Sequence, residues 1–390
     1  MRSASAAATD YLARARELAP AIAGWADRNE QERRLCGPLL EALHEAAMFR
    51  LLLPRSLGGG EVDAPTFVRV MREIAKADAS TAWCLGQTTV CSMVSAYMAP
   101  DVAARVFGDP RAVLGWGPPA QVEAVREAGG WRVTGTYPFA SGGHHATWLG
   151  PAAPCLGPDG EQLKRADGSP QMWTFIVPAS QVSWSDVWDV TGLRGTGSDT
   201  FSVSNLFVPD ELAVLRDEPS ERREPGRLYR ISTYTMFAIG FAGVSLGVAR
   251  AAMDAFAGMA GGKTPRALSK TLRENPVVQS QIGQAEARLR AAEAFLMRSV
   301  EQVWQELEGE ITIDQRVLLR MAGSHAIKEA KDVMDTVYYL AGSSAIFWEG
   351  PFDRRLRDIH TIQQQLQGRL DHFERVGQWV MGLEPETLFL

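Results

Sequence analysis

The sequence predicts an α+β protein that is mostly α, with an N-terminal helical domain (residues 1–110), a central β domain (111–220) and a C-terminal four-helix bundle (221–390). Three observations lead to this prediction. Apolar residues recur every three to four positions towards both ends of the chain, short alternating runs bounded by Gly, Pro and Asp fill the middle, and 390 residues can form several packed layers. A hydrophobic content of 46% with 22% charged residues is ordinary for a globular enzyme.

The first domain is expected to consist of helices. The helical periodicity is clearest in residues 39–49 and 67–74. Asp63, followed by Pro65, has the form of a helix start, because its carboxylate can accept unpaired N–H groups and proline is tolerated in the first turn. A glycine triplet at residues 58–60 divides the region into separate helical pieces.

The central domain is expected to be a small antiparallel barrel or sandwich. Its alternating runs include residues 131–133, 172–177 and 201–208, and turn residues separate them. The polar stretch 157–171 contains the turn sequences PDG and DGSP. It therefore predicts an exposed hairpin loop.

The last domain is expected to be a bundle of four antiparallel helices. Helical periodicity returns near residue 229 in four long segments, which end near residues 261, 309, 350 and 382. The apolar run 235–249 is shorter than a membrane span and contains glycines, so we expect a buried helix there. The charged segment 216–227 predicts a linker before the bundle.

Charge and cysteine content narrow the class of protein further. The net charge of −6 comes from intermixed acidic and basic residues, so neither nucleic acid nor a membrane is indicated as a partner. The four cysteines lack metal-ligand spacing and argue against a disulfide framework. The first ten residues lack the apolar core of a secretion signal. A cytoplasmic enzyme without a resident metal is expected.

Four motifs carry a resemblance to a known family. Residues 137–148 read YPFASGGHHATW, 188–198 read WDVTGLRGTGS, 79–83 read ASTAW and 352–358 read FDRRLRD. With the order of the domains, they resemble the acyl-CoA dehydrogenase fold. The branch they resemble most is that of the flavin-dependent monooxygenases, the oxygenase components of two-component, group D-like hydroxylases.

The resemblance implies a cofactor, partners and a reaction. The cofactor would be reduced flavin, FMN or FAD, with O2 as co-substrate and a separate flavin reductase as partner. The reaction would be hydroxylation of a small phenol-like or indole-like substrate through a flavin C4a-hydroperoxide, in a homotetramer or homodimer. A separate reductase is consistent with a chain that lacks the Gly-x-Gly-x-x-Gly dinucleotide fingerprint.

The resemblance also points to catalytic residues. Ser141 lies where the family places a hydroxyl near flavin N5, although a strand-end serine bonded to its own backbone is the alternative. Leu366 stands where the dehydrogenases often carry a catalytic glutamate, so that base is absent. Where the hydroxylases carry a histidine this chain reads QQQ, so Gln364 or Gln365 would hydrogen-bond the peroxide or the substrate without shuttling a proton.

Three histidines belong to this part of the prediction. His144 and His145 are adjacent in an expected strand, so their side chains would point to opposite faces and only one could meet the flavin. His145 matches the family position, with a core hydrogen bond as the alternative to direct catalysis. His360 precedes the usual histidine position by more than one helical turn and does not obviously replace it.

The candidate flavin-binding residues lie in several segments. The glycines of the 192–197 loop could let the backbone approach the flavin, although a tight turn explains them equally well. Lys263 and Arg273 could reach a flavin phosphate of a neighbouring subunit, or could simply be solvated helix-end cations. The full candidate set is Trp116, Phe139, Ser141, Gly142, Trp188, Arg194, Thr196, Ser198, Lys263 and Arg273.

Two further groups of residues concern the aromatic core and the helix ends. Trp83, Trp116 and Trp188 could line a flat aromatic-substrate pocket or fill the core. The pair Arg357 and Asp358 is expected to tie helix ends together.

Two other functions stay open. A flavin dehydrogenase or oxidase of the same fold, acting on an acyl-type or secondary-metabolite substrate, would need a base other than the missing glutamate, and Glu349 and His360 are the candidates. The other alternative is a non-catalytic helical scaffold that keeps the fold without its cofactor.

Overall fold

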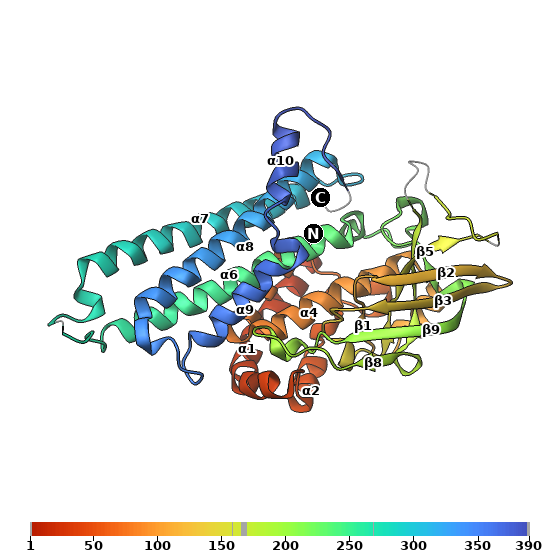
Figure 1. Cartoon of the computed structure of the whole chain (residues 1–390). Helices are drawn as coiled ribbons and strands as arrows, with labels where there is room; N and C mark the ends of the chain where they lie inside the picture. Colours follow the sequence, from red (N-terminus) through yellow and green to blue (C-terminus); the bar gives the residue numbers. More distant parts are fainter. Residues whose placement is uncertain (1, 158, 165–169, 268, 388–390) are drawn as a thin grey trace.

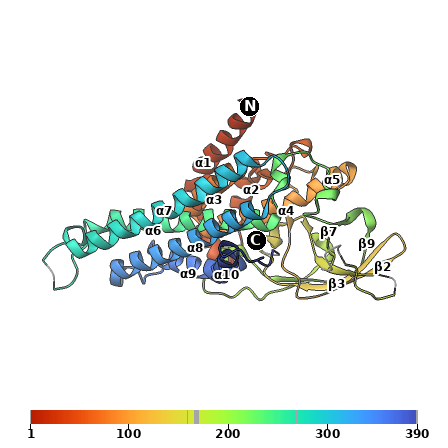
Figure 2. The same ribbon diagram turned by 90° about the horizontal axis from the view of Figure 1, so that it is seen from above.

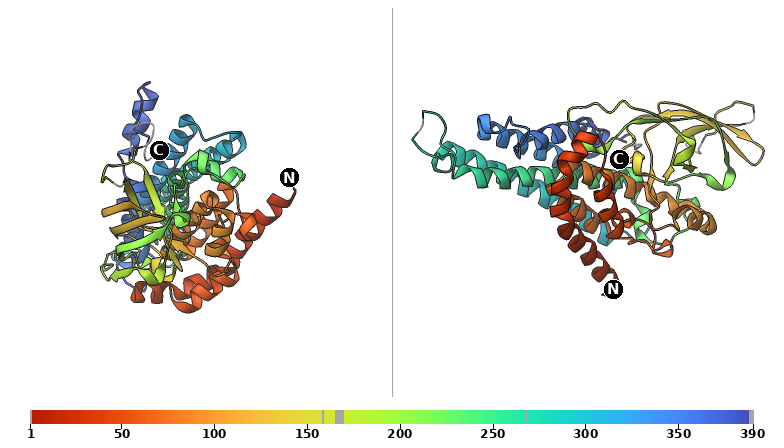
Figure 3. Two further views of the ribbon diagram at one scale, coloured as in Figure 1. Left: turned by 90° about the vertical axis from the view of Figure 1, so that its right-hand side faces the viewer. Right: turned by 90° about the horizontal axis from the view of Figure 1, so that it is seen from below.

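The computed structural model describes residues 2–157, 159–164, 170–267 and 269–387. The sheet lies at one end of the molecule, the N-terminal helices lie beside its centre, and the long C-terminal helices extend away from the sheet (Figure 1). The same arrangement is seen from above in Figure 2. Helix α1 crosses the long helices steeply, with the N-terminus projecting from the body (Figure 3).

The N-terminal region is helical, as predicted. Its helices are α1 (Arg2–Glu32), α2 (Gly37–Glu45), α3 (Ala64–Ala77), α4 (Ala79–Ser92) and α5 (Pro100–Phe107). The predicted start at Asp63 is confirmed, since its Oδ1 accepts the Thr66 N–H at 2.7 Å and Pro65 lies in the first turn. Asp78 ends α3 and caps α4, because its Oδ2 accepts the Thr81 N–H at 2.8 Å.

The central region forms a seven-stranded sheet in the order β10-β6-β5-β2-β3-β9-β8 and a three-stranded sheet in the order β1-β4-β7. The strands are β1 (Leu114–Gly115), β2 (Gln121–Glu127), β3 (Gly130–Tyr137), β4 (Trp148–Leu149), β5 (Ala152–Leu156), β6 (Met172–Phe175), β7 (Val177–Pro178), β8 (Ser183–Ser185), β9 (Thr200–Pro209) and β10 (Ala213–Val214).

The prediction of an all-antiparallel sheet is wrong in two places. Strand β5 runs parallel to β2, and β4 runs parallel to β1. The reason is the excursion of the chain after β3: it leaves the sheet, forms a turn and β4, and returns as β5 on the far side of β2. A two-residue hairpin can only place the next strand antiparallel beside the last one, whereas this longer connection carries the chain past β2, so that β5 lies beside a strand of the same direction.

The loop predicted at residues 157–171 lies partly outside the described residues, at 158 and 165–169. Its described part pairs Leu156 with Gln162 and Lys164 with Pro170 in antiparallel bridges, as in the predicted hairpin. The predicted linker 216–227 contains one short 3-10 turn, Pro219–Glu221, and another begins at its end.

The C-terminal region contains three long helices, α6 (Thr233–Ala260), α7 (Pro276–Glu306) and α8 (Ile313–Ala341). The fourth segment differs from the prediction of one helix reaching residue 382, because it is divided into α9 (Asp353–Gln364), the 3-10 turn η12 (Leu366–Gly368) and α10 (His372–Val380). At Gln365 the chain turns to an extended conformation with ψ 158°, which ends α9.

Helix α6 is buried, as predicted for its apolar run. Among the described residues it alone is long and apolar enough to match a membrane span, yet it is surrounded by protein. It packs against α3 and α8. A Cβ added at Gly240 would lie 2.6 Å from the Phe67 ring, so a glycine is needed for this close approach of α6 to α3.

The cap at Asp63 gives a stability prediction. Asp63→Ala leaves the Thr66 N–H without its partner and should lower the free energy of unfolding by about 1 kcal/mol, measured by chemical denaturation. Asp63→Ser, which retains a side-chain acceptor, should lose clearly less. Equal loss in both variants would contradict a capping role.

Candidate active site

A chain of four hydroxyl and indole groups joins α4, the turn after β3 and the loop before β9. Thr196 donates its hydroxyl to the Leu193 carbonyl at 2.8 Å, and its Oγ1 lies 2.7 Å from Ser198 Oγ. Ser198 Oγ lies 2.6 Å from Ser141 Oγ, and the Trp83 indole N–H donates to Ser141 at 3.1 Å.

The donor and acceptor roles along this series of hydrogen bonds follow from the groups at its two ends. Because Thr196 donates to a carbonyl, it accepts from Ser198, and Ser198 in turn accepts from Ser141. The Ser141 hydroxyl hydrogen is thus committed to Ser198. One lone pair of Ser141 is used by Trp83, and the other remains to accept a hydrogen bond.

Aromatic side chains surround Ser141 on two sides. Trp83 stacks on Phe241 of α6 with ring centroids 3.7 Å apart and planes 6° apart. Phe237 continues the cluster towards Trp116, whose face is covered by the Arg216 guanidinium at 4.4 Å. The structure thus brings Trp83 and Trp116 together, and sequence reasoning did not single out Arg216, which it placed in a linker.

On the other side of Ser141, Phe139 is 60% exposed and has a left-handed φ of 55°. Its ring meets Trp188 edge to face at 6.1 Å. The Trp188 indole N–H donates to the Leu193 carbonyl at 3.0 Å, so Trp188 is fixed by the same loop as Thr196. An exposed phenylalanine beside a buried hydroxyl is a surface on which a flat ring can lie.

The two adjacent histidines do not lie in a strand, which corrects the prediction. Gly142 takes a left-handed φ of 72°, and Gly143–His145 form a 3-10 turn. His144 lies 2.7 Å from Asp199 and packs on Trp184. The buried His145 Nε2 has no partner among the described residues.

His145 lies in an apolar setting beside Phe49. Burial, helped by the nearby His44 and His144, lowers the pKa of His145 to about 3. The imidazole is therefore neutral at pH 7. It can donate or accept a hydrogen bond there but cannot act as a cation.

The glycine-rich loop 192–198 is clamped to α9 and α1. The Leu193 N–H donates to the buried Asp358 Oδ1 at 2.6 Å. A Cβ on Gly192 would lie 2.1 Å from the Arg357 carbonyl, and one on Gly195 about 3.0 Å from the Ser80 side chain. Close packing against neighbouring helices, an explanation that sequence reasoning did not offer, accounts for both positions.

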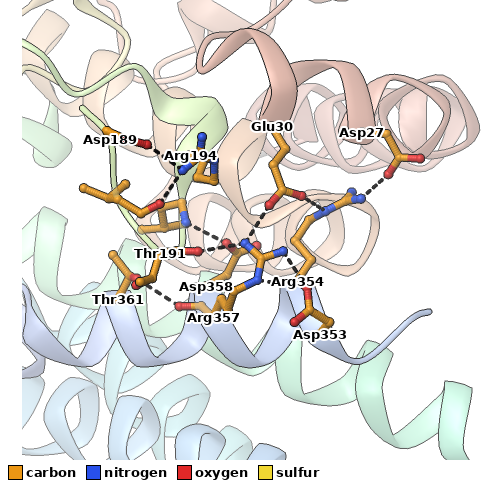
Figure 4. A network of polar contacts seen from close by, with 12 residues as sticks. Asp27, Glu30, Asp189, Thr191, Arg194, Asp353, Arg354, Arg357, Asp358 and Thr361 are labelled. Atoms are coloured by element: carbon orange, nitrogen blue, oxygen red, sulfur yellow. Dashed lines mark hydrogen bonds and ion pairs between the residues drawn. The ribbon is translucent and has the colours of Figure 1, made fainter. Parts of the chain in front are cut away.

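Arg357 and Asp358 both tie α9 to neighbouring segments, as expected from the sequence, but each does so through its own partners. Arg357 contacts Glu30 of α1 at 2.6 Å, Asp353 at 2.7 Å and the Thr191 carbonyl at 2.7 Å (Figure 4). Arg357 thus ties α9 to α1 and to the loop, and Asp358 holds the loop through Leu193. The reason is that adjacent residues on a helix point in different directions.

The carboxyl group of Asp358 is in an unusual electrostatic position. Burial is the largest cause that raises its pKa to about 7, and the nearby Asp78 and Glu30 contribute in the same direction. The Leu193 N–H and Arg357 act in the opposite direction. The clamp therefore contains a carboxyl group that changes protonation near neutral pH rather than near pH 4.

The glutamines of the last segment lie around η12. Gln364 is exposed, and the Gln365 Oε1 accepts the Gln367 N–H at 2.7 Å. His360 lies on the exposed face of α9, 2.8 Å from Asp335, so the structure does not bring it to Ser141. Glu349 is also exposed.

The three candidate cations lie in different places. Arg194, within the 192–198 loop, contacts Asp189 at 3.0 Å and the Val190 carbonyl at 2.7 Å. Lys263 donates to the Ser344 hydroxyl at 2.7 Å, and Arg273 is exposed next to Gly261. Both belong to the connection between α6 and α7, which lies at the end of the bundle remote from the sheet (Figure 1).

A second group of polar side chains, which sequence reasoning missed, lies between α8, η12 and α10. Its centre is Arg320, which is 1% exposed and donates to Gln367 Oε1. His372 donates from Nε2 to the Leu366 carbonyl at 2.7 Å. The available signal was an arginine inside the apolar run VLLRMAG of α8, where helical periodicity places a core residue.

The helical domain, the curled sheet and the terminal helices, with a hydroxyl site between aromatic surfaces, define an enzyme of the flavin-dependent oxidoreductase class. Family profiles agree with this class. The profile described as acyl-CoA dehydrogenase, N-terminal domain, matches residues 6–107, and that described as acyl-CoA dehydrogenase, C-terminal domain, matches residues 239–367. The chain belongs to the acyl-CoA dehydrogenase family.

Similar proteins point to one branch of that family. The chain is 27% identical over 361 residues to indole-3-acetate monooxygenase of Pseudomonas putida, covering 91% of this chain and 90% of the relative. It is 27% identical over 391 residues to the oxygenase component of the FADH(2)-dependent resorcinol hydroxylase of a Rhizobium species, covering 94% of each.

A solved structure agrees with these relatives. The HsaA monooxygenase of Mycobacterium tuberculosis superimposes with a TM-score of 0.89 at 25% identity, covering 98% of this chain and 100% of that one.

The clamp predicts a pH dependence of stability. Because folding raises the pKa of Asp358 from 3.8 to about 7, its protonated form stabilises the fold below pH 4, and this contribution is lost as the pH rises to 7. Asp358→Asn keeps the acceptor for Leu193 but cannot ionise. Relative to wild type it should gain up to about 4 kcal/mol between pH 4 and pH 8, at about 1.4 kcal/mol per unit.

The measurement is thermal denaturation of both proteins across this pH range. Asp353→Asn, which removes an Arg357 partner outside the clamp, is the control and should follow wild type in pH dependence. If wild type and Asp358→Asn show the same dependence on pH, the carboxyl is ionised in the folded protein and this explanation is wrong.

Proposed function

We propose that this chain is the oxygenase component of a two-component flavin-dependent monooxygenase that hydroxylates a small aromatic or heteroaromatic compound. The observation that carries the proposal is the free lone pair of Ser141, held between Phe139 and the Trp83 cluster. The names of the relatives support the substrate class, since they refer to indole-3-acetate and resorcinol.

The residues present fit a reduced flavin. Its N5–H is a donor, and Ser141 offers an acceptor whose own hydrogen is already bound by Ser198. The exposed ring of Phe139 and the edge of Trp188 offer an apolar surface for a flat ring. When bound, the flavin would activate O2 and supply one oxygen atom to the aromatic ring.

The remaining candidates take supporting roles in this proposal. Gln364 or Gln365 donates an amide hydrogen to the bound oxygen species or to the substrate. His145 stays neutral and supports the Ser141 turn from the Phe49 side. Thr196 and Ser198 orient the Ser141 hydroxyl, and water is kept from Ser141 by Trp83 and the side chains of α6.

The proposal includes partners. A separate reductase in the cytoplasm supplies reduced FMN or FAD, and the chain assembles as a tetramer or dimer. In that assembly, Lys263 and Arg273 of one subunit contact the flavin phosphate of another, while Arg194 binds the flavin within its own subunit. The dehydrogenase alternative gains little support here, because its candidate bases Glu349 and His360 are exposed.

The function is tested by the origin of the product oxygen. With a generic flavin reductase, a panel of indoles, phenols and aromatic acids should yield a hydroxylated product that carries oxygen-18 when oxygen-18 gas is used, as read by mass spectrometry. Reduction of bound flavin by a substrate under nitrogen, without labelled product in air, would identify a dehydrogenase instead.

The role of Ser141 is tested by coupling. Ser141→Ala removes the acceptor for the flavin N5–H, so the fraction of reduced flavin lost as hydrogen peroxide should rise about tenfold, measured alongside product by chromatography. The matched control is Ser95→Ala, a buried serine that bonds only the Ser92 carbonyl of its own helical segment. Unchanged coupling in Ser141→Ala would remove the assigned role.

A further inference from the structure

Arg320 of α8 is a fully buried guanidinium without a counter-ion. Its side chain is 1% exposed, and its Nη1 donates to the neutral amide oxygen of Gln367. Nε and Nη2 have no partner, and among the residues that the structure describes no carboxylate lies within 4 Å of it. Arginine is rarely buried unless it is paired, because an isolated charge is costly to remove from water.

Other unpaired polar atoms gather around the same point. Ser324, one turn further along α8, has a buried hydroxyl without a partner, and so do the Gln363 Oε1 and the Asp371 Oδ1. These atoms come from α8, α9 and the start of α10, which pack together around η12. A pocket of about 340 Å³ opens beside them, lined by Gln363, Gln364, Gly368, Arg369, Leu370 and Asp371.

The charges around Arg320 leave an excess of positive charge. Burial lowers the pKa of Arg320 most, the neighbouring Arg375 and Arg316 lower it as well, and Asp371 opposes them, which together bring it to about 9. Arg375 already contacts Glu386 at 2.9 Å. Asp371 already contacts Arg369 at 2.9 Å.

The histidine of the cluster does not change this balance. Burial and Arg320 lower the pKa of His372 to about 4, so it is neutral at pH 7. Arg320 therefore remains a cation for which the described part of the chain supplies no carboxylate.

The position of this cation connects it to the aromatic cluster of the active site. Gly323, one turn along α8 from Arg320, packs against Ala238 of α6, since a Cβ there would lie 3.3 Å from the Ala238 carbonyl. Ala238 belongs to the same stretch of α6 as Phe237 and Phe241, which contact Trp116 and Trp83 respectively. Gln364 and Gln365, proposed above as substrate contacts, adjoin Gln367, the Arg320 partner.

We propose that Arg320 binds the carboxylate of an aromatic acid, so that the enzyme selects anionic substrates over neutral phenols and indoles; this inference rests on the proposed function. Nε and Nη2 form the edge of the guanidinium that holds two carboxylate oxygens in parallel hydrogen bonds. The Ser324 hydroxyl and a glutamine amide satisfy the remaining lone pairs. A phosphate dianion fits less well, because Asp371 would repel it more strongly.

The test is equilibrium binding to the full-length protein by calorimetry at pH 7, with pairs of ligands that differ in the carboxylate. The pairs are indole-3-acetate with skatole and para-hydroxyphenylacetate with para-cresol. The acid of each pair should bind about tenfold or more tightly than its neutral partner. Inorganic phosphate and FMN are separate competitors.

Two variants isolate the cation. Arg320→Met should bind acid and neutral ligand alike. Gln367→Glu places a carboxylate beside Arg320, so it should raise the melting temperature and also abolish the preference for the acid. The matched control is Arg250→Gln, since Arg250 of the same bundle is already paired with Glu286 at 2.9 Å, and it should keep the preference.

Equal affinity for acid and neutral ligands in the wild type would overturn the inference, as would a preference that survives in Gln367→Glu. Phosphate or FMN binding more tightly than the acid, and losing affinity in the same variants, would assign the site to the cofactor and overturn it too. If neutral phenols gave labelled product while acids bound no more tightly than neutral ligands, this inference would be overturned and the proposed function would stand. Acid preference without any hydroxylation would support the anion site and overturn the proposed function.

Discussion

The hydrogen bond from the Leu193 N–H to the buried carboxyl of Asp358 fixes the loop on which the active site depends. That loop supplies the carbonyl that orders Thr196 and Ser198, and this order directs the hydrogen of Ser141 towards Ser198. Trp83 extends the same order into α4 and α6. One contact between α9 and the loop thus sets the donor and acceptor pattern of a distant hydroxyl.

Much of the fold follows from local patterns. The start of α3 at Asp63 and the burial of α6 were predictable, because caps and apolar periodicity act over a few residues. The parallel pairing of β2 with β5 and the break of the last helix at Gln365 were not. Both depend on which distant segments meet, and neither proline nor a glycine marks the position where the helix ends.

The candidate site, too, could be predicted only in part, because some of its features depend on which distant segments meet. Motif positions placed Ser141, Ser198 and Phe139 near one another, and the structure brings them together. The roles of Arg320 and Asp358 depend on burial between helices far apart in sequence, which shifts the pKa of each away from its ordinary value. The sequence offers only a charged residue among apolar neighbours as a sign of such a position.

The measurement that tests the central claim most directly is a crystal structure of the protein with reduced flavin, grown without oxygen. The account predicts the ring against Phe139 with N5 about 3 Å from Ser141 Oγ, and the Ser141 to Ser198 contact unchanged. A ring bound elsewhere, or one whose N5 faces a group other than Ser141, would contradict it.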